Sequence, residues 1–179
     1  FATIDVNGLS FTFSMYRTGH PQPVWSHTFT KIPSVTKTFT SLSTGGYDGW
    51  VLETGENTNK GGTLNGTATT LRLGDDLVKK QYRSILSFAT GNPIPDNAVI
   101  TKVTLKLKRQ GIVGGGNPVT LFQGFMADIK RGIFTTSALQ ATDWQATAQK
   151  TVGPFTPSLS SGWYTLNLTS ARAYINKLA

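Results

Sequence analysis

The segment from Leu71 to Lys108 constrains the fold of this chain most strongly. It contains three short runs in which apolar and polar residues alternate, separated by a Gly-Asp-Asp turn and a Pro-Ile-Pro-Asp-Asn turn. Alternation with a period of two, bounded by turn residues, is typical of half-buried strands in an antiparallel sheet. The segment therefore predicts an antiparallel β architecture.

The remainder of the chain after residue 34 continues this pattern. Apolar runs are separated by loops rich in Gly, Asn and Thr, and helix signals are scarce. Short strands with such turns point to a β-sandwich or a jelly roll. We predict an all-β body over residues 35–179, an antiparallel β-sandwich or jelly roll with little helix. Its expected strands are 37–42, 49–53, 69–73, 82–88, 100–108, 118–129 and 162–168.

Residues 1–15 carry the clearest local signal, that of a β-hairpin arm. Asn7-Gly8 lies between alternating apolar residues, and this dipeptide favours a type I′ turn, which needs positive φ at both positions. The expected register then opposes Val6 to Leu9, Ile4 to Phe11 and Ala2 to Phe13. The apolar face of the arm comprises Ala2, Ile4, Val6, Leu9, Phe11, Phe13 and Met15. Because an isolated hairpin is only marginally stable in water, we expect this face to dock.

Residues 16–34 are expected to form a linker between the arm and the body. This segment contains Gly19, Pro21, Pro23 and Pro33. Proline fixes φ and lacks a backbone N–H, so this density opposes regular structure and favours an extended, semi-rigid chain. The predicted order is therefore hairpin arm 1–15, proline-rich linker 16–34 and body 35–179.

The net charge of +8 invites a nucleic-acid interpretation, which the distribution of charge argues against. The basic residues are dispersed, and Lys106 and Lys108 alternate with apolar residues, so they fall on the solvated face of one strand. Lysine there also discourages pairing between strand edges. Grooves that bind single-stranded nucleic acid combine cations with aromatic rings on one face. We therefore expect no nucleic-acid partner.

Several other classes are disfavoured by composition. The chain has no cysteine, which excludes disulfides and thiolate metal sites. His20 and His27 have no Asp or Glu close in sequence, so they are expected to be structural or exposed rather than metal ligands. No apolar run approaches the roughly 18 residues of a membrane span. The first residue is Phe1, so we expect that a leader was removed or that the chain was trimmed.

Catalytic signals are limited to pairs of carboxylates. Glycoside hydrolysis needs two carboxylates about 5–10 Å apart, and Glu53 and Glu56 are close enough in sequence for this, but surface charges flanking a turn explain them as well. Asp75 and Asp76 follow a glycine and are expected in a turn, with a calcium loop as the alternative. We predict that the protein is not an enzyme and has no catalytic residue, cofactor or metal.

Aromatic residues and Asn-X-Thr patterns are the candidates for contact with sugars. Trp50 and Trp163 fall in predicted strands and are expected in the core, whereas Tyr47 and Trp144 fall in less regular segments and are the candidate glycan platforms. N-glycosylation requires Asn-X-Ser/Thr. The candidate acceptors are Asn65 and Asn167.

About a third of the chain resembles the DNRLRE-type domains, which are extracellular β-sandwich modules related to carbohydrate-binding modules. The matching elements begin with the acidic residue that opens a strand, Asp48, the Asn-Gly loop 57–62 and the Leu-Arg-Leu-Gly run 71–74. They continue with the Tyr-Arg-Ser strand 82–88, the Pro-Asp-Asn turn 95–100 and the following strand 103–107. These motifs are structural, so the resemblance implies a fold and an extracellular location more directly than a function.

Two departures from that family suggest an assembly. The body ends where the family has further strands, and the apolar hairpin on a tether is an addition. Strand addition from one subunit to the next uses such parts, and a head-to-tail contact that does not close builds filaments. We therefore expect a structural subunit of an extracellular fibre or surface appendage, with itself as partner. As an alternative to docking on another subunit, the arm docks on the body of its own chain. The alternative function is a carbohydrate-binding module with glycan partners.

Overall fold

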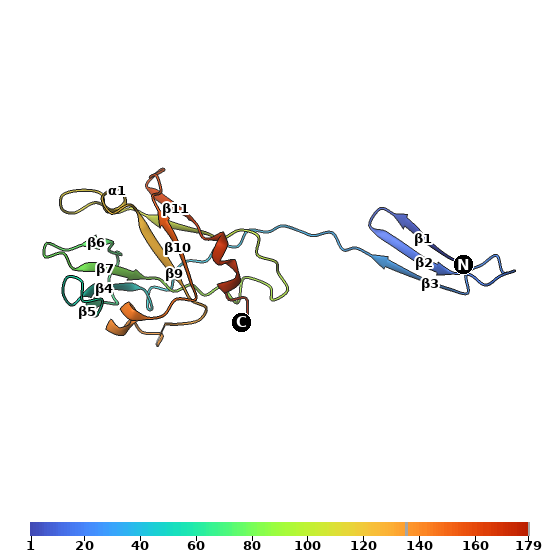
Figure 1. Ribbon diagram of the computed structural model, residues 1–179, viewed down its shortest axis with the longest axis horizontal. Helices are drawn as coiled ribbons and strands as arrows, with labels where there is room; N and C mark the ends of the chain where they lie inside the picture. The colour runs from blue at the N-terminus through green and yellow to red at the C-terminus, as the bar shows by residue number, and fades with distance from the viewer. Residues whose placement is uncertain (135, 179) are drawn as a thin grey trace. The chain divides into compact units, whose positions relative to one another are not determined.

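The computed structural model describes residues 1–134 and 136–178, which divide into two compact units (Figure 1). Unit 1 is Phe1–Thr38 and unit 2 is Phe39–Ala179. Most regular structure is strand, and each described strand pair is antiparallel. The predicted all-β, antiparallel fold class with little helix is confirmed. Among the described residues, no helix has the length and apolar character needed to cross a membrane.

Unit 1 is a single three-stranded sheet in the order β1-β2-β3, formed by β1 (Ala2–Asn7), β2 (Ser10–Met15) and β3 (Trp25–Thr30) (Figure 1). β1 and β2 form the predicted hairpin, but the predicted turn is wrong by one residue and the predicted register by two. Val6 faces Phe11, and Gly8-Leu9 occupies the turn. Only the glycine has a positive φ, +57°, which suits a type II′ turn with Gly first. A shift of two leaves every side chain on its predicted face.

The predicted linker 16–34 is also corrected, because it contains β3. The six residues of β3 pair with β2, and in them Trp25, His27 and Phe29 alternate with Ser and Thr, which is a strand pattern. The prolines of this segment lie outside β3, so they do not interrupt its pairing with β2. The segment without regular secondary structure between the units is residues 31–42.

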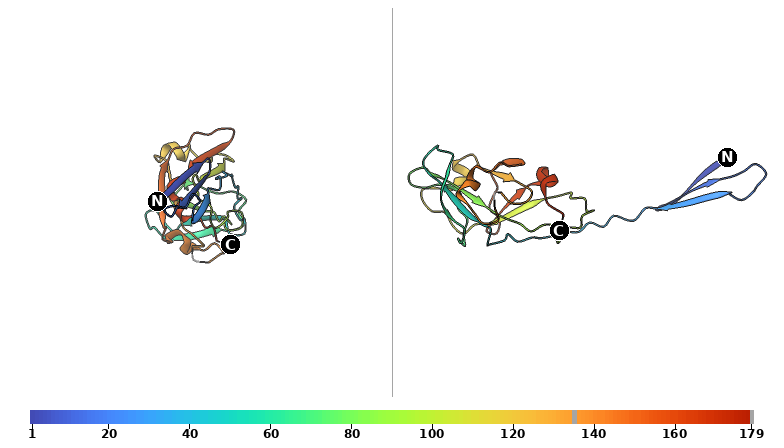
Figure 2. Two further views of the ribbon diagram at one scale, coloured as in Figure 1. Left: turned by 90° about the vertical axis from the view of Figure 1, so that its right-hand side faces the viewer. Right: turned by 90° about the horizontal axis from the view of Figure 1, so that it is seen from below.

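Unit 2 contains three antiparallel sheets that give it a sandwich-like character. A four-stranded sheet has the order β5-β4-β7-β6, and two further pairs are β11-β8 and β10-β9. In Figures 1 and 2 the teal and green strands of the first sheet lie on one side of the unit, and the orange and red strands on the other. The strands are β4 (Gly49–Glu53), β5 (Gly61–Asn65), β6 (Gly74–Asp75), β7 (Gln81–Ile85), β8 (Thr104–Lys108), β9 (Phe125–Ile129), β10 (Lys150–Phe155) and β11 (Trp163–Asn167).

Two short helices, α1 (Pro118–Leu121) and η1 (Ala141–Gln145), connect described strands, and a third, η2 (Thr169–Tyr174), follows β11. The predicted strand 118–129 is therefore a helix followed by β9. Asn117 caps α1, since its Oδ1 accepts from the Val119 N–H at 3.1 Å, and proline fits the first helical turn. The predicted strands 37–42 and 69–73 are not strands, whereas β5 and β10 were not predicted.

In the core of unit 2, η1 packs against β4 and β5, and η2 packs against β10. The buried apolar residues are Trp50, Val51, Val119, Trp144, Leu166, Leu168 and Ala171. The prediction that Trp50 is a core residue is confirmed. The same prediction for Trp163 is wrong, because β11 turns Leu166 inward and leaves the Trp163 ring 40% exposed.

Residues that carry the family resemblance stabilise this core. The carboxylate of Asp48 accepts from the Ser87 N–H at 2.8 Å. The guanidinium of Arg72 lies 4.7 Å from the centre of the Trp50 ring and donates to the Tyr82 hydroxyl at 3.0 Å. These motifs therefore fix the position of neighbouring segments around the four-stranded sheet, as a structural motif would.

Candidate functional site

The most unusual surface of the molecule is one face of the sheet in unit 1, called here the arm face. The register of β1, β2 and β3 aligns apolar side chains in three rows that cross all three strands. These rows are Val6–Phe11–Phe29, Ile4–Phe13–His27 and Ala2–Met15–Trp25. The arm face thus consists of eight apolar or aromatic side chains and one histidine.

The arm face has no second layer over it within unit 1. Ile4 is 65% exposed and Val6 is 76% exposed, while Phe11, Met15, Trp25 and Phe29 are each about half exposed. The rings are in contact with one another: Phe11 stacks on Phe29 with centroids 4.6 Å apart, and His27 meets the ring of Phe29 edge-on at 4.5 Å. A contiguous, exposed apolar surface of this kind marks an interaction site or an aggregation liability.

The opposite face of the same sheet is polar. It presents Ser, Thr, Asn and Asp side chains from all three strands, and the hydroxyl oxygens of Thr12 and Thr28 are 2.8 Å apart. The sheet is therefore amphipathic, with one face suited to water and the other to a partner. A free three-stranded sheet gains stability when its apolar face packs against another element.

The structure brings most predicted arm residues together on this face. Ala2, Ile4, Val6, Phe11, Phe13 and Met15 lie on the arm face as predicted, whereas Leu9 lies in the turn. Trp25, His27 and Phe29 were missed as members of the face. Their alternation with Ser26, Thr28 and Thr30 was the signal that identifies them.

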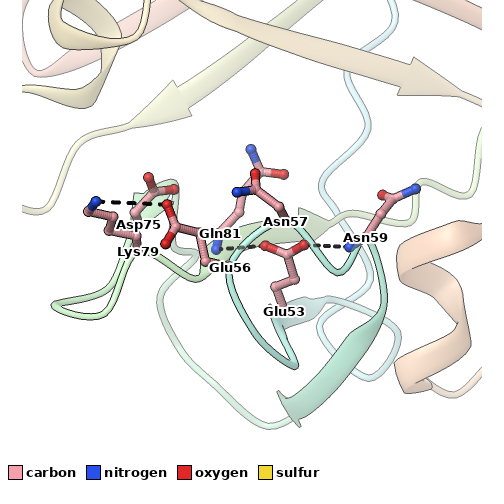
Figure 3. Close-up of a pocket in the computed structure, with 7 residues that line it drawn as sticks. All are labelled: Glu53, Glu56, Asn57, Asn59, Asp75, Lys79 and Gln81. Carbon is pink, nitrogen blue, oxygen red and sulfur yellow. Dashed lines mark hydrogen bonds and ion pairs between the residues drawn. The ribbon is translucent and has the colours of Figure 1, made fainter.

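A second feature is an acidic pocket of about 380 Å³ in unit 2, shown in Figure 3. It lies at the end of the β4–β7 ladder, where Glu53 ends β4 and Gln81 begins β7. Its lining residues are Glu53, Glu56, Asn57, Asn59, Asp75, Lys79 and Gln81. Glu53, Glu56 and Asp75 of the two predicted carboxylate pairs thus share one pocket, and Asp76 lies outside its lining.

Glu53 and Glu56 of this pocket, and Asp76 next to it in sequence, are already engaged by the protein. Glu53 is 7% exposed, and its two carboxylate oxygens accept from the Asn59 N–H at 2.6 Å and the Gln81 N–H at 3.4 Å (Figure 3). Glu56 lies 3.8 Å from the ammonium of Lys79. Asp76 accepts from the Val78 and Lys80 N–H groups, both at 2.9 Å. These carboxylates therefore order the loops that line the pocket. The described residues contain no group of three or more potential metal ligands.

The surroundings of Asp75 raise the pKa of its carboxyl group. Burial raises the pKa of Asp75, and the charges of Asp76, Glu53 and Glu56 raise it further. The folded protein therefore holds this proton more tightly than the unfolded chain does. As a result, Asp75 contributes stability at low pH that is lost as the pH rises from the ordinary aspartate pKa of 3.8 through the raised folded value.

We therefore expect Asp75→Asn to stabilise unit 2 at neutral pH and to leave its stability unchanged below pH 3, where the aspartate is protonated in both states. Urea unfolding at a series of pH values measures this difference. Asp96→Asn, which removes a carboxylate outside the pocket lining, is the control. Equal effects of the two variants across the pH range would contradict the assignment of repulsion to the pocket.

A third feature is a groove of about 390 Å³ in unit 2, called here the basic groove. Its apolar lining comes from residues 98–100 and from Ala173 and Ile175, and its cations are Arg131, Arg172 and Lys177. Arg131 donates to the Ala173 carbonyl, and Lys177 donates to the Ala98 carbonyl at 3.0 Å. The lining described for this groove contains no carboxylate, so it combines apolar surface with positive charge.

The two candidate glycan platforms differ in exposure. Tyr47 is 43% exposed and is available to a ligand. Trp144 is 2% exposed, so its assignment as a platform is wrong. The guanidinium of Arg83 lies 4.3 Å from the centre of its ring, and its indole N–H donates to Asn59 at 3.3 Å. Trp144 is therefore a core residue that attaches η1 to the sheet.

Both candidate glycosylation acceptors are held in turns by their own motif. The Asn65 side-chain oxygen accepts from the backbone and hydroxyl of Thr67 at 3.0 and 3.1 Å. The Asn167 oxygen accepts from the Thr169 N–H at 3.0 Å, and Asn167 is exposed. Their glycosylation stays a prediction.

No family model matches the chain, and neither the curated proteins nor the solved structures contain a match to it. The resemblance to DNRLRE-type domains therefore stays a prediction.

Proposed function

We propose that the chain is a non-enzymatic structural subunit of an extracellular fibre or surface appendage. In this proposal, unit 1 of one copy docks on unit 2 of the next copy, and repetition of this contact builds a homopolymer. The observation that carries the proposal is the arm face, an aromatic-rich surface without a covering layer in its own unit. An arm on one unit and an acceptor on another form a heterologous contact, which propagates unless the rotation between copies closes a ring.

Burial of the arm face supplies enough free energy to compete with the cost of association. Each large apolar side chain contributes about 1.5–3 kcal/mol when it is fully transferred from water. Six such side chains of the arm face are 43–76% exposed. Burying their exposed surface therefore yields part of this transfer free energy for each side chain. Association costs about 4–15 kcal/mol. Backbone pairing along an open strand edge, as in β-strand addition, then adds affinity and register.

The connection between the units permits docking within one chain or between chains. Residues 31–42 have no regular secondary structure, and twelve extended residues span up to about 40 Å. Docking on the same chain would give a closed monomer, and docking on another copy would give a polymer. An experiment on assembly distinguishes the two.

Phe29→Glu should abolish assembly, because it places a carboxylate on the arm face, against the rings of Phe11 and His27. The matched control is Thr28→Glu, which introduces the same side chain at the next residue of β3, on the polar face. Negative-stain electron microscopy and sedimentation of concentrated protein measure the outcome. We expect filaments for the unmodified chain and for Thr28→Glu, and dispersed subunits for Phe29→Glu. Compact monomers for all three proteins would overturn the proposal.

A carbohydrate-binding module is the second candidate function. The exposed ring of Tyr47 supports it, since sugar rings stack on exposed aromatic side chains. The burial of Trp144 removes the other candidate platform. A glycan array that compares the unmodified chain with Tyr47→Ala tests this function. Binding that depends on Tyr47, in a protein that stays monomeric, would favour the module over the fibre subunit.

A further inference from the structure

The basic groove borders a stretch of backbone that has no hydrogen-bonding partner in the described structure. Residues 99–102 run directly into β8, and none of the hydrogen bonds among the described residues involves their backbone groups. β8 itself pairs with β11 along one edge only. Val99, Thr101 and Lys102 are exposed and Ile100 is half-buried, so these backbone groups lie at the surface, where an open strand edge can pair with another chain. The segment is therefore suited to receive an additional strand.

The side chains around this segment define what the strand should carry. Val99 is 85% exposed, and Ile100 and Ile175 line the groove with it. Arg172 is exposed and makes one long hydrogen bond, 3.4 Å to the Thr169 carbonyl, so its guanidinium keeps most of its donors free. A suitable strand would present apolar side chains on one side and a carboxylate on the other.

Strand β1 has these properties. It is an edge strand of unit 1, so one side of its backbone is open. Its sequence alternates Ile4 and Val6 with Asp5, and both apolar side chains are largely exposed. Asp5 is the sole acidic residue among the first 38 residues of the chain. β1 therefore matches the basic groove in backbone pairing, apolar content and charge.

We propose that β1 of one copy adds to residues 99–102 of a second copy. Ile4 and Val6 then cover Val99 and the apolar floor of the groove, and Asp5 pairs with the exposed Arg172. This inference rests on the proposed function and deepens it, because it assigns the acceptor site. The donor lies in unit 1 and the acceptor in unit 2, so the contact is head-to-tail.

Cross-linking between cysteine variants tests this contact directly, because the chain contains no cysteine of its own. One full-length chain carries Ile4→Cys and a second carries Val99→Cys. The two are mixed and treated with a short bismaleimide, and covalent dimers are counted on a denaturing gel. The control replaces the second chain with Leu77→Cys. Leu77 is fully exposed and follows Asp75 of the acidic pocket, at the other end of the β4–β7 ladder.

The groove and the acidic pocket lie at opposite ends of that ladder. Glu53 and Gln81 mark the pocket end, while Gly49 and Ile85 mark the other end. The chain leaving β7 at that second end reaches Thr90, whose hydroxyl donates to the carbonyl of Asn176 at 2.6 Å, beside the groove. Figure 1 shows the same separation, with the loops of β4 and β6 away from η2. The two acceptor cysteines therefore report on different ends of unit 2.

We expect the yield of covalent dimers between the Ile4→Cys chain and the Val99→Cys chain to exceed the yield with the Leu77→Cys chain at least tenfold. Filaments that depend on Phe29 but give no excess of the Val99 cross-link would overturn the acceptor assignment and leave the fibre function intact. The absence of filaments would overturn both. A chain that carries both Ile4→Cys and Val99→Cys adds a further outcome. If it cross-links only within itself at every concentration, the arm docks in cis and the contact between copies is wrong.

A charge exchange tests the assigned ion pair without relying on cross-linking. Asp5→Lys and Arg172→Glu should each raise the critical concentration for assembly about tenfold, which corresponds to about 1.4 kcal/mol. The double variant Asp5→Lys/Arg172→Glu restores opposite charges and should return the critical concentration close to that of the unmodified chain. Additive losses in the double variant would contradict the pairing of these two residues.

Discussion

Replacing Trp144 with alanine should lower the free energy of unfolding of unit 2 by about 3–5 kcal/mol, the range for large buried aromatic residues. Trp144 is 2% exposed and lies on η1, which packs against the four-stranded sheet. Its removal leaves a cavity and exposes the Arg83 guanidinium, which now lies over the ring. It also removes one of the donors to the side-chain oxygen of Asn59. Lost packing and lost polar contacts therefore act in the same direction.

Trp163→Ala is the matched control, because it deletes the same side chain from a position that is 40% exposed. We expect it to cost about 1 kcal/mol, a typical effect of a single substitution. Urea unfolding followed by tryptophan fluorescence and far-ultraviolet circular dichroism measures both variants. Equal losses in the two variants would show that Trp144 does not hold η1 to the sheet.

The sequence pattern was sufficient to predict the faces of the arm but not its register. Apolar alternation assigns Ile4, Val6, Phe11 and Phe13 to one face, and any shift of two residues preserves that assignment. The turn depended on local backbone energetics instead. Asn7-Gly8 favours a type I′ turn, whereas the structure uses the positive φ of Gly8 alone. Pairing along the strands outweighs this local preference of the Asn7-Gly8 turn.

The sequence of β3 has the alternation of a strand, but the prolines before it favour the prediction of an irregular linker. Pro21 and Pro23 suggested an irregular linker, and proline does oppose regular structure where it occurs. The alternating residues of Trp25–Thr30 follow these prolines and pair with β2 without interruption. The alternation within Trp25–Thr30 is a strand signal that the preceding prolines do not weaken.

The location of Trp144 could not be obtained from the sequence, because its burial depends on tertiary contacts. η1 is one short 3-10 helix without a periodic apolar pattern. The tryptophan is covered by Arg83 from β7 and bonded to Asn59 from the loop after β4, both distant in sequence. The burial of Glu53 has a similar origin, since its carboxylate accepts from the N–H of Asn59 in the loop after β4 and from the N–H of Gln81 at the start of β7. Sequence alone placed both residues at the surface.

The same contact between η1 and the sheet explains the second large effect, that of Gly61→Ala. A methyl group on Gly61 of β5 would overlap the carbonyl oxygen of Ala141 and lie 2.8 Å from Cβ of Trp144. The first of these atoms belongs to the backbone, so it cannot move away as a flexible side chain would. We expect a loss of about 3 kcal/mol, the upper part of the usual range for overpacking. Urea unfolding of Gly61→Ala measures it.

Gly46→Ala is the control for this substitution, because a methyl group there meets no atom within 4 Å and the residue is outside the positive-φ region. We expect its stability to differ little from that of the unmodified chain. The double variant Gly61→Ala/Trp144→Ala then tests the mechanism. Once Trp144 no longer holds η1, the helix can shift away from the added methyl group. The combined loss should therefore be smaller than the sum of the single losses, and a strictly additive result would mean that the two residues stabilise unit 2 independently.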